Sequence, residues 1–231
     1  MEEKNKQNSE KKLAAEKAVE FVKDGMIVGI GTGSTVFFAI KILGELVQNG
    51  LNISAVSTSD STTKLAEAEG IRLITLEKAV RPDINIDGAD EADRNFNGIK
   101  GGGGALLFEK IVALSSAKNI WIIDSSKNVE QLGKFPLPVE VIPFGYKRIL
   151  NIFKEMNFYP ELRIKNNNPF LTDSGNYILD LHLEKIEDAG ILDKEIKLIT
   201  GVVETGLFIN IADVIITGKN NSVEILRKEK L

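Results

Sequence analysis

The pattern of hydrophobic and polar positions in the first half of the chain alternates between short apolar runs and longer stretches with helical spacing. Short runs bounded by glycine or polar residues predict buried strands, and the longer stretches predict helices. The predicted strands are 26–30, 53–56, 71–76, 83–86 and 120–123, and the predicted helices are 13–23, 36–47, 62–69 and 105–117. This alternation is typical of a mostly parallel sheet with helices on both faces, so we expect an α/β fold.

The pattern changes near the sequence Phe-Pro-Leu-Pro at residues 135–138. The segments expected after it are an extended run at 139–142, a helix at 146–156, strands around 162 and at 178–183, a helix at 184–196 and a strand at 202–204. This order predicts a small α+β unit of the split βαβ, ferredoxin-like kind. The final apolar run, 212–217, is expected to return to the first sheet.

Composition and charge exclude several classes of protein. Hydrophobic residues make up 43% of the 231 residues and charged residues 27%, which is enough apolar material for a packed core. With 29 basic and 33 acidic residues, the chain has no basic surplus for binding a nucleic-acid backbone. The absence of cysteine excludes disulfides, zinc ribbons, iron–sulfur clusters and thiol nucleophiles. A single histidine disfavours histidine metal sites and a Ser-His-Asp triad.

No segment of the sequence has the pattern of an export signal or a membrane span. Residues 1–12 mix lysine and glutamate with polar residues and contain no apolar stretch. The hydrophobic stretch 36–47 is interrupted by Lys41 and Glu45, and it is shorter than the roughly 20 residues that a membrane span needs. We therefore expect a soluble, cytoplasmic protein without a membrane partner.

The sequence GIGTGST, residues 29–35, lies between a predicted strand and a predicted helix. It is not the dinucleotide fingerprint, because Ser34 stands where that motif has its last glycine, and it lacks the Gly-Lys-Ser/Thr of a Walker A loop. One interpretation is an ordinary turn capped by Ser34 or Thr35. Three glycines interleaved with three hydroxyl residues exceed what a cap needs, so the pattern favours a phosphate site at a helix N-terminus.

A second motif, DGADEAD at residues 87–93, directly follows a predicted strand. Its carboxylates would lie at the C-terminal edge of a parallel sheet, where open α/β folds bind ligands. Glu91 and Asp93 can also be interpreted as parts of a solvated acidic loop. The spacing of the acidic residues does not match an EF-hand calcium loop, and a magnesium site stays open at this point.

A third motif is Lys100 followed by four glycines and a helical segment that contains Glu109. A glycine run of this kind destabilises a fold unless the backbone is needed, for example as a nest of N–H donors for an anion. The positions three and four residues from Glu109 on both sides are alanine, leucine and valine. This apolar face predicts a partly desolvated carboxylate that could act as a general base. The alternative is a glutamate at the margin of the helix that pairs with a lysine.

A fourth motif, DSSK at residues 124–127, ends another predicted strand. Lys127 could neutralise a phosphate at the same sheet edge, or the motif could be a helix cap with a surface lysine. His182 alternates with leucines in phase with Asp180 and is expected to face solvent. Trp121 is expected in the core.

Taken together, these segments make the sequence similar to the ribose-5-phosphate isomerase A family over nearly its whole length. The resemblance is carried by GIGTGSTV at 29–36, DGADE at 87–91, KGGGGALLFEKIVA at 100–113, DSSK at 124–127, GKFPLPVEVIP at 133–143 and GVVETGLF at 201–208. It implies a Rossmann-like domain over 1–131, completed by 207–231, a smaller α+β domain at 132–206, and a homo-oligomer, either a dimer or a tetramer. One departure is Phe108, immediately before Glu109, where arginine is common in the family.

The resemblance also implies an activity and a set of site residues. The family interconverts D-ribose 5-phosphate and D-ribulose 5-phosphate, in the non-oxidative pentose phosphate pathway, without a cofactor or metal. Glu109 falls at the position of the proton acceptor, and Asp87 and Lys100 are expected to assist catalysis. The implied substrate contacts are Thr32, Gly33, Ser34, Thr35, Asp87, Gly88, Ala89, Asp90, Lys100, Gly101, Gly102, Gly103 and Lys127.

Two functions from other classes remain as alternatives. A sugar-phosphate sensor could use a similar sheet and phosphate loop without turnover, although residues 1–12 are too short for a helix-turn-helix. A metal-dependent phosphohydrolase could use Asp87 and Asp90 as ligands.

Overall fold

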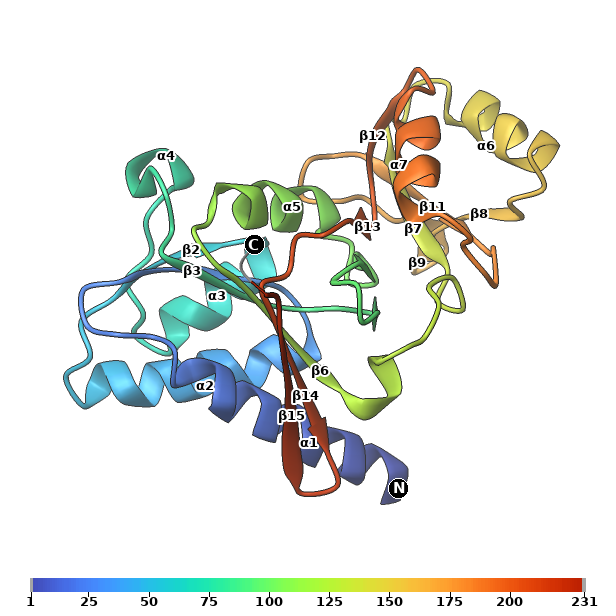
Figure 1. The fold of residues 1–231 in the computed structure, drawn as a ribbon. Coiled ribbons are helices and arrows are strands. Elements are labelled where there is room, and N and C mark those ends of the chain that lie inside the picture. Colours follow the sequence, from blue (N-terminus) through green and yellow to red (C-terminus); the bar gives the residue numbers. More distant parts are fainter. Residues whose placement is uncertain (1, 230–231) are drawn as a thin grey trace. The chain divides into compact units, whose positions relative to one another are not determined.

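The computed structural model describes residues 2–229, and these form two compact units (Figure 1). The first unit comprises residues 2–89, 108–128 and 211–229, and the second comprises Asp90–Leu107 and Val129–Asn210. The division differs from the predicted one at residues 90–107, 129–131 and 207–210, which group with the second unit rather than the first. The reason is local pairing, because β4 (Glu91–Ala92) and β5 (Gly98–Ile99) form a three-stranded sheet with β13 (Leu207–Phe208).

The first unit is built on a six-stranded sheet in the order β15-β14-β6-β3-β1-β2. Neighbouring strands are parallel except β14 and β15, which form an antiparallel hairpin. The strands are β1 (Ile27–Ile30), β2 (Ser54–Ser57), β3 (Ile84–Gly88), β6 (Asn119–Asp124), β14 (Val214–Lys219) and β15 (Ser222–Arg227). The mostly parallel α/β sheet expected from the sequence is confirmed, as is the return of the late apolar run to this sheet.

Helices cover both faces of this sheet, and the alternation of side chains along β1 shows which helix packs where. Val28 and Ile30 lie in the core shared with α1 and α2, whereas a Cβ at Gly29 would point at Val112 of α5 on the opposite face. Figure 1 shows α1 and α2 on one side of the sheet and α5 on the other. The helices are α1 (Glu2–Val19), α2 (Ser34–Gln48), α3 (Asp60–Ala68), α4 (Leu76–Ala79) and α5 (Leu106–Ser115).

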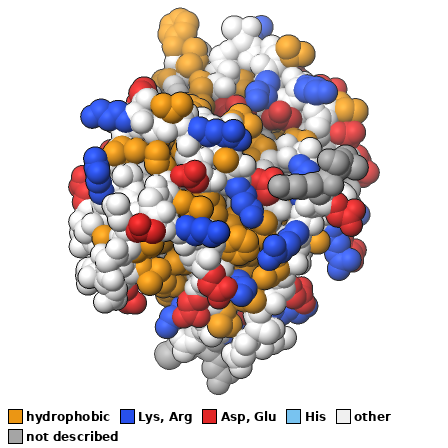
Figure 2. Space-filling model, turned by 60° about the vertical axis from the view of Figure 1, so that its left-hand side comes forward, with side chains coloured by type: hydrophobic (Ala, Val, Ile, Leu, Met, Phe, Trp, Pro, Cys, Tyr) orange, Lys and Arg blue, Asp and Glu red, His pale blue; other side chains and the backbone are white. Residues whose placement is uncertain are grey.

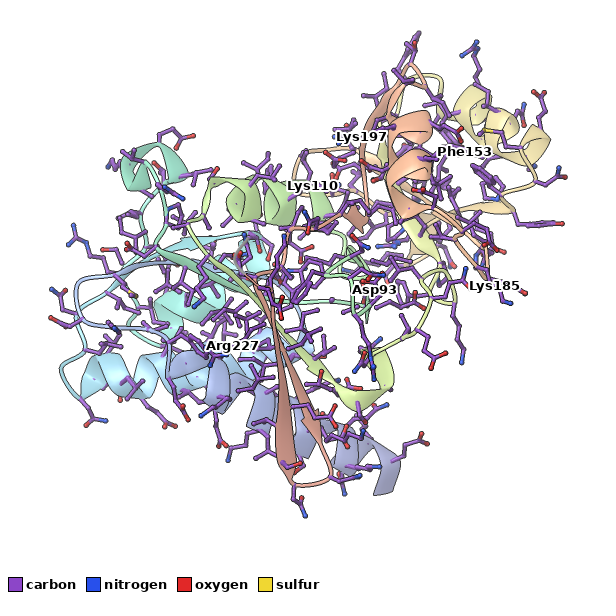
Figure 3. The ribbon with its side chains drawn as sticks, viewed as in Figure 1. Asp93, Lys110, Phe153, Lys185, Lys197 and Arg227 are labelled. Atoms are coloured by element: carbon purple, nitrogen blue, oxygen red, sulfur yellow. The ribbon has the colours of Figure 1, made fainter. Side chains whose placement is uncertain are left out.

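The second unit contains a four-stranded antiparallel sheet in the order β12-β7-β11-β8. Its elements follow one another as β7 (Leu137–Val141), α6 (Tyr146–Glu155), β8 (Pro160–Leu162), β11 (Tyr177–Leu181), α7 (Ala189–Lys197) and β12 (Val202–Thr205). This is the arrangement expected for a split βαβ unit. A two-stranded ribbon of β9 (Ile164–Lys165) and β10 (Asn168–Pro169) is also present. Phe153 of α6 is fully buried in this unit's core (Figure 3).

Several elements differ from the sequence prediction. The first helix was predicted at 13–23, but it begins at Glu2 and ends at Val19. Residues 71–76 do not form a strand, because Leu73 makes only an isolated bridge to Ala55 before α4 begins. The helix predicted from 184 begins at 189, since the Asp188 carboxylate accepts a hydrogen bond from the Ile191 N–H and caps it. The strand β15 was not predicted. In the structure, Asn220 and Asn221 both have positive φ and form the tight turn of the β14–β15 hairpin.

The surface carries charges of both signs. On the face in Figure 2, Lys and Arg side chains are interspersed with Asp and Glu side chains rather than gathered into one basic stripe. Within residues 2–229, no helix is long and apolar enough to cross a membrane. As expected, Trp121 is fully buried and His182 is exposed.

Candidate active site

The loops that follow three adjacent parallel strands carry most of the predicted site residues of the first unit. β1 pairs with β3, and β3 pairs with β6. The loop at 31–35 follows β1, Asp87 and Gly88 end β3, and the turn η1 (Ser125–Lys127) follows β6. Because these strands are parallel, their carboxyl ends meet at one edge of the sheet, which is where open α/β folds bind ligands.

The loop after β1 leads into α2 without a side-chain cap. Gly33 is the N-cap residue, its φ is 132°, and as a glycine it provides no side-chain capping hydrogen bond. The interpretation that Ser34 or Thr35 serves as the cap is therefore wrong, because α2 begins at Ser34. A helix start of this kind presents backbone N–H groups and the positive end of the helix dipole, both of which suit an anion.

Thr32 anchors this loop through its hydroxyl group. The Thr32 Oγ1 lies 2.8 Å from the Thr58 Oγ1, 2.8 Å from the Ser59 Oγ and 3.1 Å from the Thr62 Oγ1. Thr62 in turn donates to the Gly31 carbonyl at 2.9 Å. The hydroxyl-rich segment 57–63 was not singled out in the sequence, although its density of Ser and Thr is the signal that would have found it.

Asp87 is fully buried at the end of β3 and holds the loop from the other side. Its Oδ1 accepts hydrogen bonds from the Gly88 N–H at 2.7 Å and the Thr32 N–H at 3.3 Å. A Cβ at Gly31 would lie 1.8 Å from this same oxygen, so only glycine allows the chain to pass so close to the carboxylate. The contact ties the first motif to the second.

We expect Gly31→Ala to destabilise the first unit and to lower activity. The added methyl group overlaps the Asp87 carboxylate, and overpacking of this kind costs typically about 1–3 kcal/mol in the free energy of unfolding. Urea unfolding of the variant measures the loss. The matched control is Gly190→Ala on α7, where a Cβ has ordinary contacts only; an unchanged midpoint for Gly31→Ala would contradict this packing.

Glu109 lies in the first turn of α5, and its side chain is only 3% exposed. The burial predicted from its apolar helical face is therefore confirmed. Phe108 takes a different direction around the helix: it is 37% exposed and lines a groove of about 670 Å³ with Ile111 and Arg72. The residue that departs from the family's pattern thus faces this groove.

The second unit holds Asp90 and the glycine run as one tied structure. The Asp90 carboxylate accepts a hydrogen bond from the Gly102 N–H at 2.7 Å, and a Cβ at Gly102 would lie 2.7 Å from the Asp90 Oδ1. Gly101 has a φ of 102°. Arg163 donates to the Gly101 carbonyl at 2.8 Å and is itself paired with Asp180. The glycines are therefore needed for both conformation and close approach.

Lys100 precedes this run and is 2% exposed. Its backbone N–H donates to the Gly206 carbonyl at 2.9 Å, and its Nζ lies 5.3 Å from the centroid of the Phe208 ring. Both contacts lie within the second unit. The negative face of an aromatic ring attracts an ammonium group at this distance.

The interpretation of Glu91 and Asp93 as parts of a solvated loop is wrong. Glu91 is 4% exposed and accepts hydrogen bonds from the Gly133 and Phe135 N–H groups at 2.7 and 2.6 Å. Asp93 accepts from the Asn95 and Asn97 N–H groups and organises the turn between β4 and β5 (Figure 3). Glu91 and Asp93 therefore have structural roles. The sequence of the motif alone does not distinguish them from Asp87 and Asp90. Across residues 2–229, no group of three or more His, Asp or Glu side chains is placed to hold a metal ion.

Comparison with known proteins identifies the relatives of this chain. The family model described as ribose 5-phosphate isomerase A (phosphoriboisomerase A) matches residues 54–222. Ribose-5-phosphate isomerase A of Listeria monocytogenes serotype 4b (strain F2365) is 49% identical over 222 residues, which covers 95% of this chain and 99% of that protein.

Solved structures give the same result. Ribose 5-phosphate isomerase from Plasmodium falciparum superposes with a TM-score of 0.92 at 39% identity, covering 96% of this chain and 100% of that one. A D-ribose-5-phosphate isomerase in complex with phospho-erythronic acid superposes with a TM-score of 0.92 at 39% identity, covering 94% and 97% of the two chains. With the site motifs carried on this fold, the chain belongs to the ribose-5-phosphate isomerase A family.

Proposed function

We propose that this protein interconverts D-ribose 5-phosphate and D-ribulose 5-phosphate through an enediolate, with Glu109 as the base. The observation that carries the proposal is the buried Glu109 at the start of α5, in a chain 49% identical to a named isomerase over nearly its full length. The chemistry needs no redox cofactor, because the aldose and the ketose differ only in the position of two hydrogens.

The proton transfer requires a single base. Glu109 removes the proton from C2 of the open-chain aldose, the electrons of that C–H bond form the C1–C2 double bond, and O1 takes the negative charge of the enediolate. The same carboxyl group returns a proton to C1 while the O2 hydroxyl proton passes to O1, so that O2 becomes the ketone oxygen. One carboxylate can serve both steps because C1 and C2 are adjacent. Burial of the carboxylate, which is 3% exposed, favours this role by removing the water that would otherwise solvate it.

The enediolate carries negative charge that preorganised donors must stabilise. We assign this role to Lys100 and to the N–H groups of the glycine run, with Gly101, Gly102 and Gly103 as substrate contacts. Asp87 assists opening of the furanose ring by accepting or donating the hydroxyl proton. Asp90, which holds the Gly102 N–H, completes the contact segment with Gly88 and Ala89.

The phosphate group is bound by the loop Thr32–Thr35 and by Lys127. The support for this assignment is the uncapped start of α2, the glycine N-cap at 33, and the position of Lys127 after a strand at the same sheet edge. A helix N-terminus and a lysine are both suited to a phosphate dianion.

The test of the proposed function is incubation with ribose 5-phosphate in the presence of a chelator. We expect a ketose to form with no release of inorganic phosphate. Binding without ketose would favour a sugar-phosphate sensor, and chelator-sensitive phosphate release would favour a metal-dependent phosphohydrolase. The pathway and the homo-oligomeric assembly implied by the resemblance stay predictions, as does the cytoplasmic location expected from the sequence pattern. Sedimentation measures the assembly, and fractionation measures the location.

Replacing Lys127 by alanine should weaken the binding of ribose 5-phosphate far more than the binding of unphosphorylated ribose. Loss of a charge-assisted contact to phosphate is worth about 1.5–3 kcal/mol, or roughly 10- to 150-fold in affinity. Parallel kinetics with the two sugars measure the difference. Equal losses for both would remove Lys127 from the phosphate site.

A further inference from the structure

Glu10 of α1 is a buried acidic residue that has no role in the reaction proposed above. It is 2% exposed, whereas Glu3 and Glu16 on the same helix are exposed. A carboxylate is buried at a cost unless hydrogen bonds replace its hydration. The partners of Glu10 therefore indicate what its burial achieves.

Those partners belong to the turn that carries Lys127. The Glu10 Oε2 accepts hydrogen bonds from the Ser125 Oγ at 2.7 Å and the Ser125 N–H at 3.0 Å. The Oε1 accepts from the Asn220 N–H at 3.3 Å, and the Lys6 Nζ lies 3.9 Å away. Glu10 thus joins the end of β6 to the turn of the β14–β15 hairpin.

The turn itself is short and depends on such contacts. It comprises only Ser125–Lys127, with the Asp124 carboxylate accepting from the Ser126 N–H at 3.1 Å. Glu10 and Asp124 therefore accept hydrogen bonds from the first two backbone N–H groups of the turn, and Lys127 is the third residue of the turn. A second α1 residue reaches the same place, because the Lys11 Nζ lies 4.0 Å from the Asp124 carboxylate.

The fold brings α1 unusually close to the sheet at this point. A Cβ at Gly218 of β14 would lie 1.9 Å from the Glu10 carbonyl oxygen, so the helix backbone rests directly on this glycine. Gly218 pairs with Asp124 in the sheet register. Figure 1 shows α1 running alongside β14 and β15. The close approach lets the short Glu10 side chain reach Ser125.

We propose that Glu10 is a positioning residue, which holds the Ser125–Lys127 turn in the conformation from which Lys127 contacts the substrate phosphate. This inference rests on the phosphate role proposed above for Lys127. Burial by itself would raise the pKa of Glu10, but the hydrogen bonds from Ser125 and Asn220 and the charge of Lys6 outweigh it and keep the pKa below its usual value. Glu10 is therefore an ionised carboxylate at neutral pH.

The test is a double-mutant cycle with Glu10→Ala, Lys127→Ala and the double variant, measured as KM and kcat for ribose 5-phosphate. If only about a tenth of the molecules without the Glu10 carboxylate hold the turn in its phosphate-binding conformation, KM rises about tenfold. We expect kcat to change little, Glu10→Gln to restore most of the affinity through its amide oxygen, and Glu10→Ala to add almost nothing in the Lys127→Ala background. Glu16→Ala, an exposed glutamate of the same helix, is the matched control and should leave KM unchanged.

Each other outcome contradicts the inference. A lower melting temperature with unchanged KM would make Glu10 a structural residue only, and a KM effect of equal size with and without Lys127 would show that it does not act through that lysine. If Lys127→Ala itself leaves KM unchanged while isomerisation proceeds, both the phosphate role of Lys127 and the positioning role of Glu10 are wrong. Failure of the wild-type protein to isomerise at all would instead overturn the proposed function.

Discussion

Glu109→Gln is expected to lower kcat for ribose 5-phosphate isomerisation by roughly 100- to 10,000-fold, the usual contribution of a positioned general base. Glutamine has nearly the same shape as glutamate and fills the same buried position, but its amide cannot take a proton from C2. Substrate binding should therefore remain close to that of the wild-type protein. The measurements are steady-state kinetics in both directions and the binding of phospho-erythronic acid, the ligand of a related isomerase structure.

The control for this variant is Glu67→Gln, which makes the same chemical change at an exposed position of α3. It should leave kcat and the melting temperature unchanged. A Glu109→Gln protein that is folded and keeps more than about a tenth of the wild-type kcat would show that another group is the base, because that loss is below the usual range for a general base.

Lys100→Met is expected to lower kcat by about 100- to 1,000-fold with little change in KM, which corresponds to about 2.7–4 kcal/mol of transition-state stabilisation. The ammonium interacts more strongly with the enediolate than with the neutral sugar, so its removal acts on the transition state rather than on the bound substrate. Methionine retains most of the aliphatic stem of lysine. The melting temperature should consequently change little.

Lys165→Met provides the matched control for Lys100→Met. Lys165 lies in the same unit, and its Nζ is 5.7 Å from the centroid of the Phe170 ring, but its side chain is exposed. We expect near wild-type kinetics from this variant. If Lys100→Met melts much earlier, or binds poorly yet turns over normally at saturation, Lys100 is a structural or ground-state contact.

The overall architecture could be predicted from the sequence because each buried strand of the first unit is a short apolar run between helical stretches. The exceptions have physical causes. The run 71–76 is as apolar as a strand, but Leu73 pairs with β2 at a single bridge, so no ladder forms. β15 alternates hydrophobic and polar residues within a charged C-terminal segment, and its only clear signal is the Asn-Asn turn before it.

Candidate site residues could be selected from the sequence where a residue type in that setting has few structural uses. A run of four glycines or a glutamate on an apolar helical face is unfavourable unless the backbone or the carboxylate is needed. Residues that act through others were not predictable in this way. Glu10 is one of several charged residues in a polar segment, and only the tertiary contact with Ser125 distinguishes it. Glu91 and Asp87 occur in one motif, and only the structure shows that Glu91 accepts from the N–H groups of Gly133 and Phe135 whereas Asp87 accepts from that of Thr32.

The most direct test of the central claim is solvent-deuterium exchange into ribose 5-phosphate, followed by proton NMR in deuterium oxide for the wild-type protein and Glu109→Gln. If Glu109 removes the C2 proton to form an enediolate, the wild-type protein should produce ribulose 5-phosphate and replace the C2 proton of the aldose with deuterium over repeated turnovers. The glutamine variant should leave that proton in place for at least about 100 times longer. Exchange at the wild-type rate in Glu109→Gln, or ketose formation without any exchange at C2, would contradict the account.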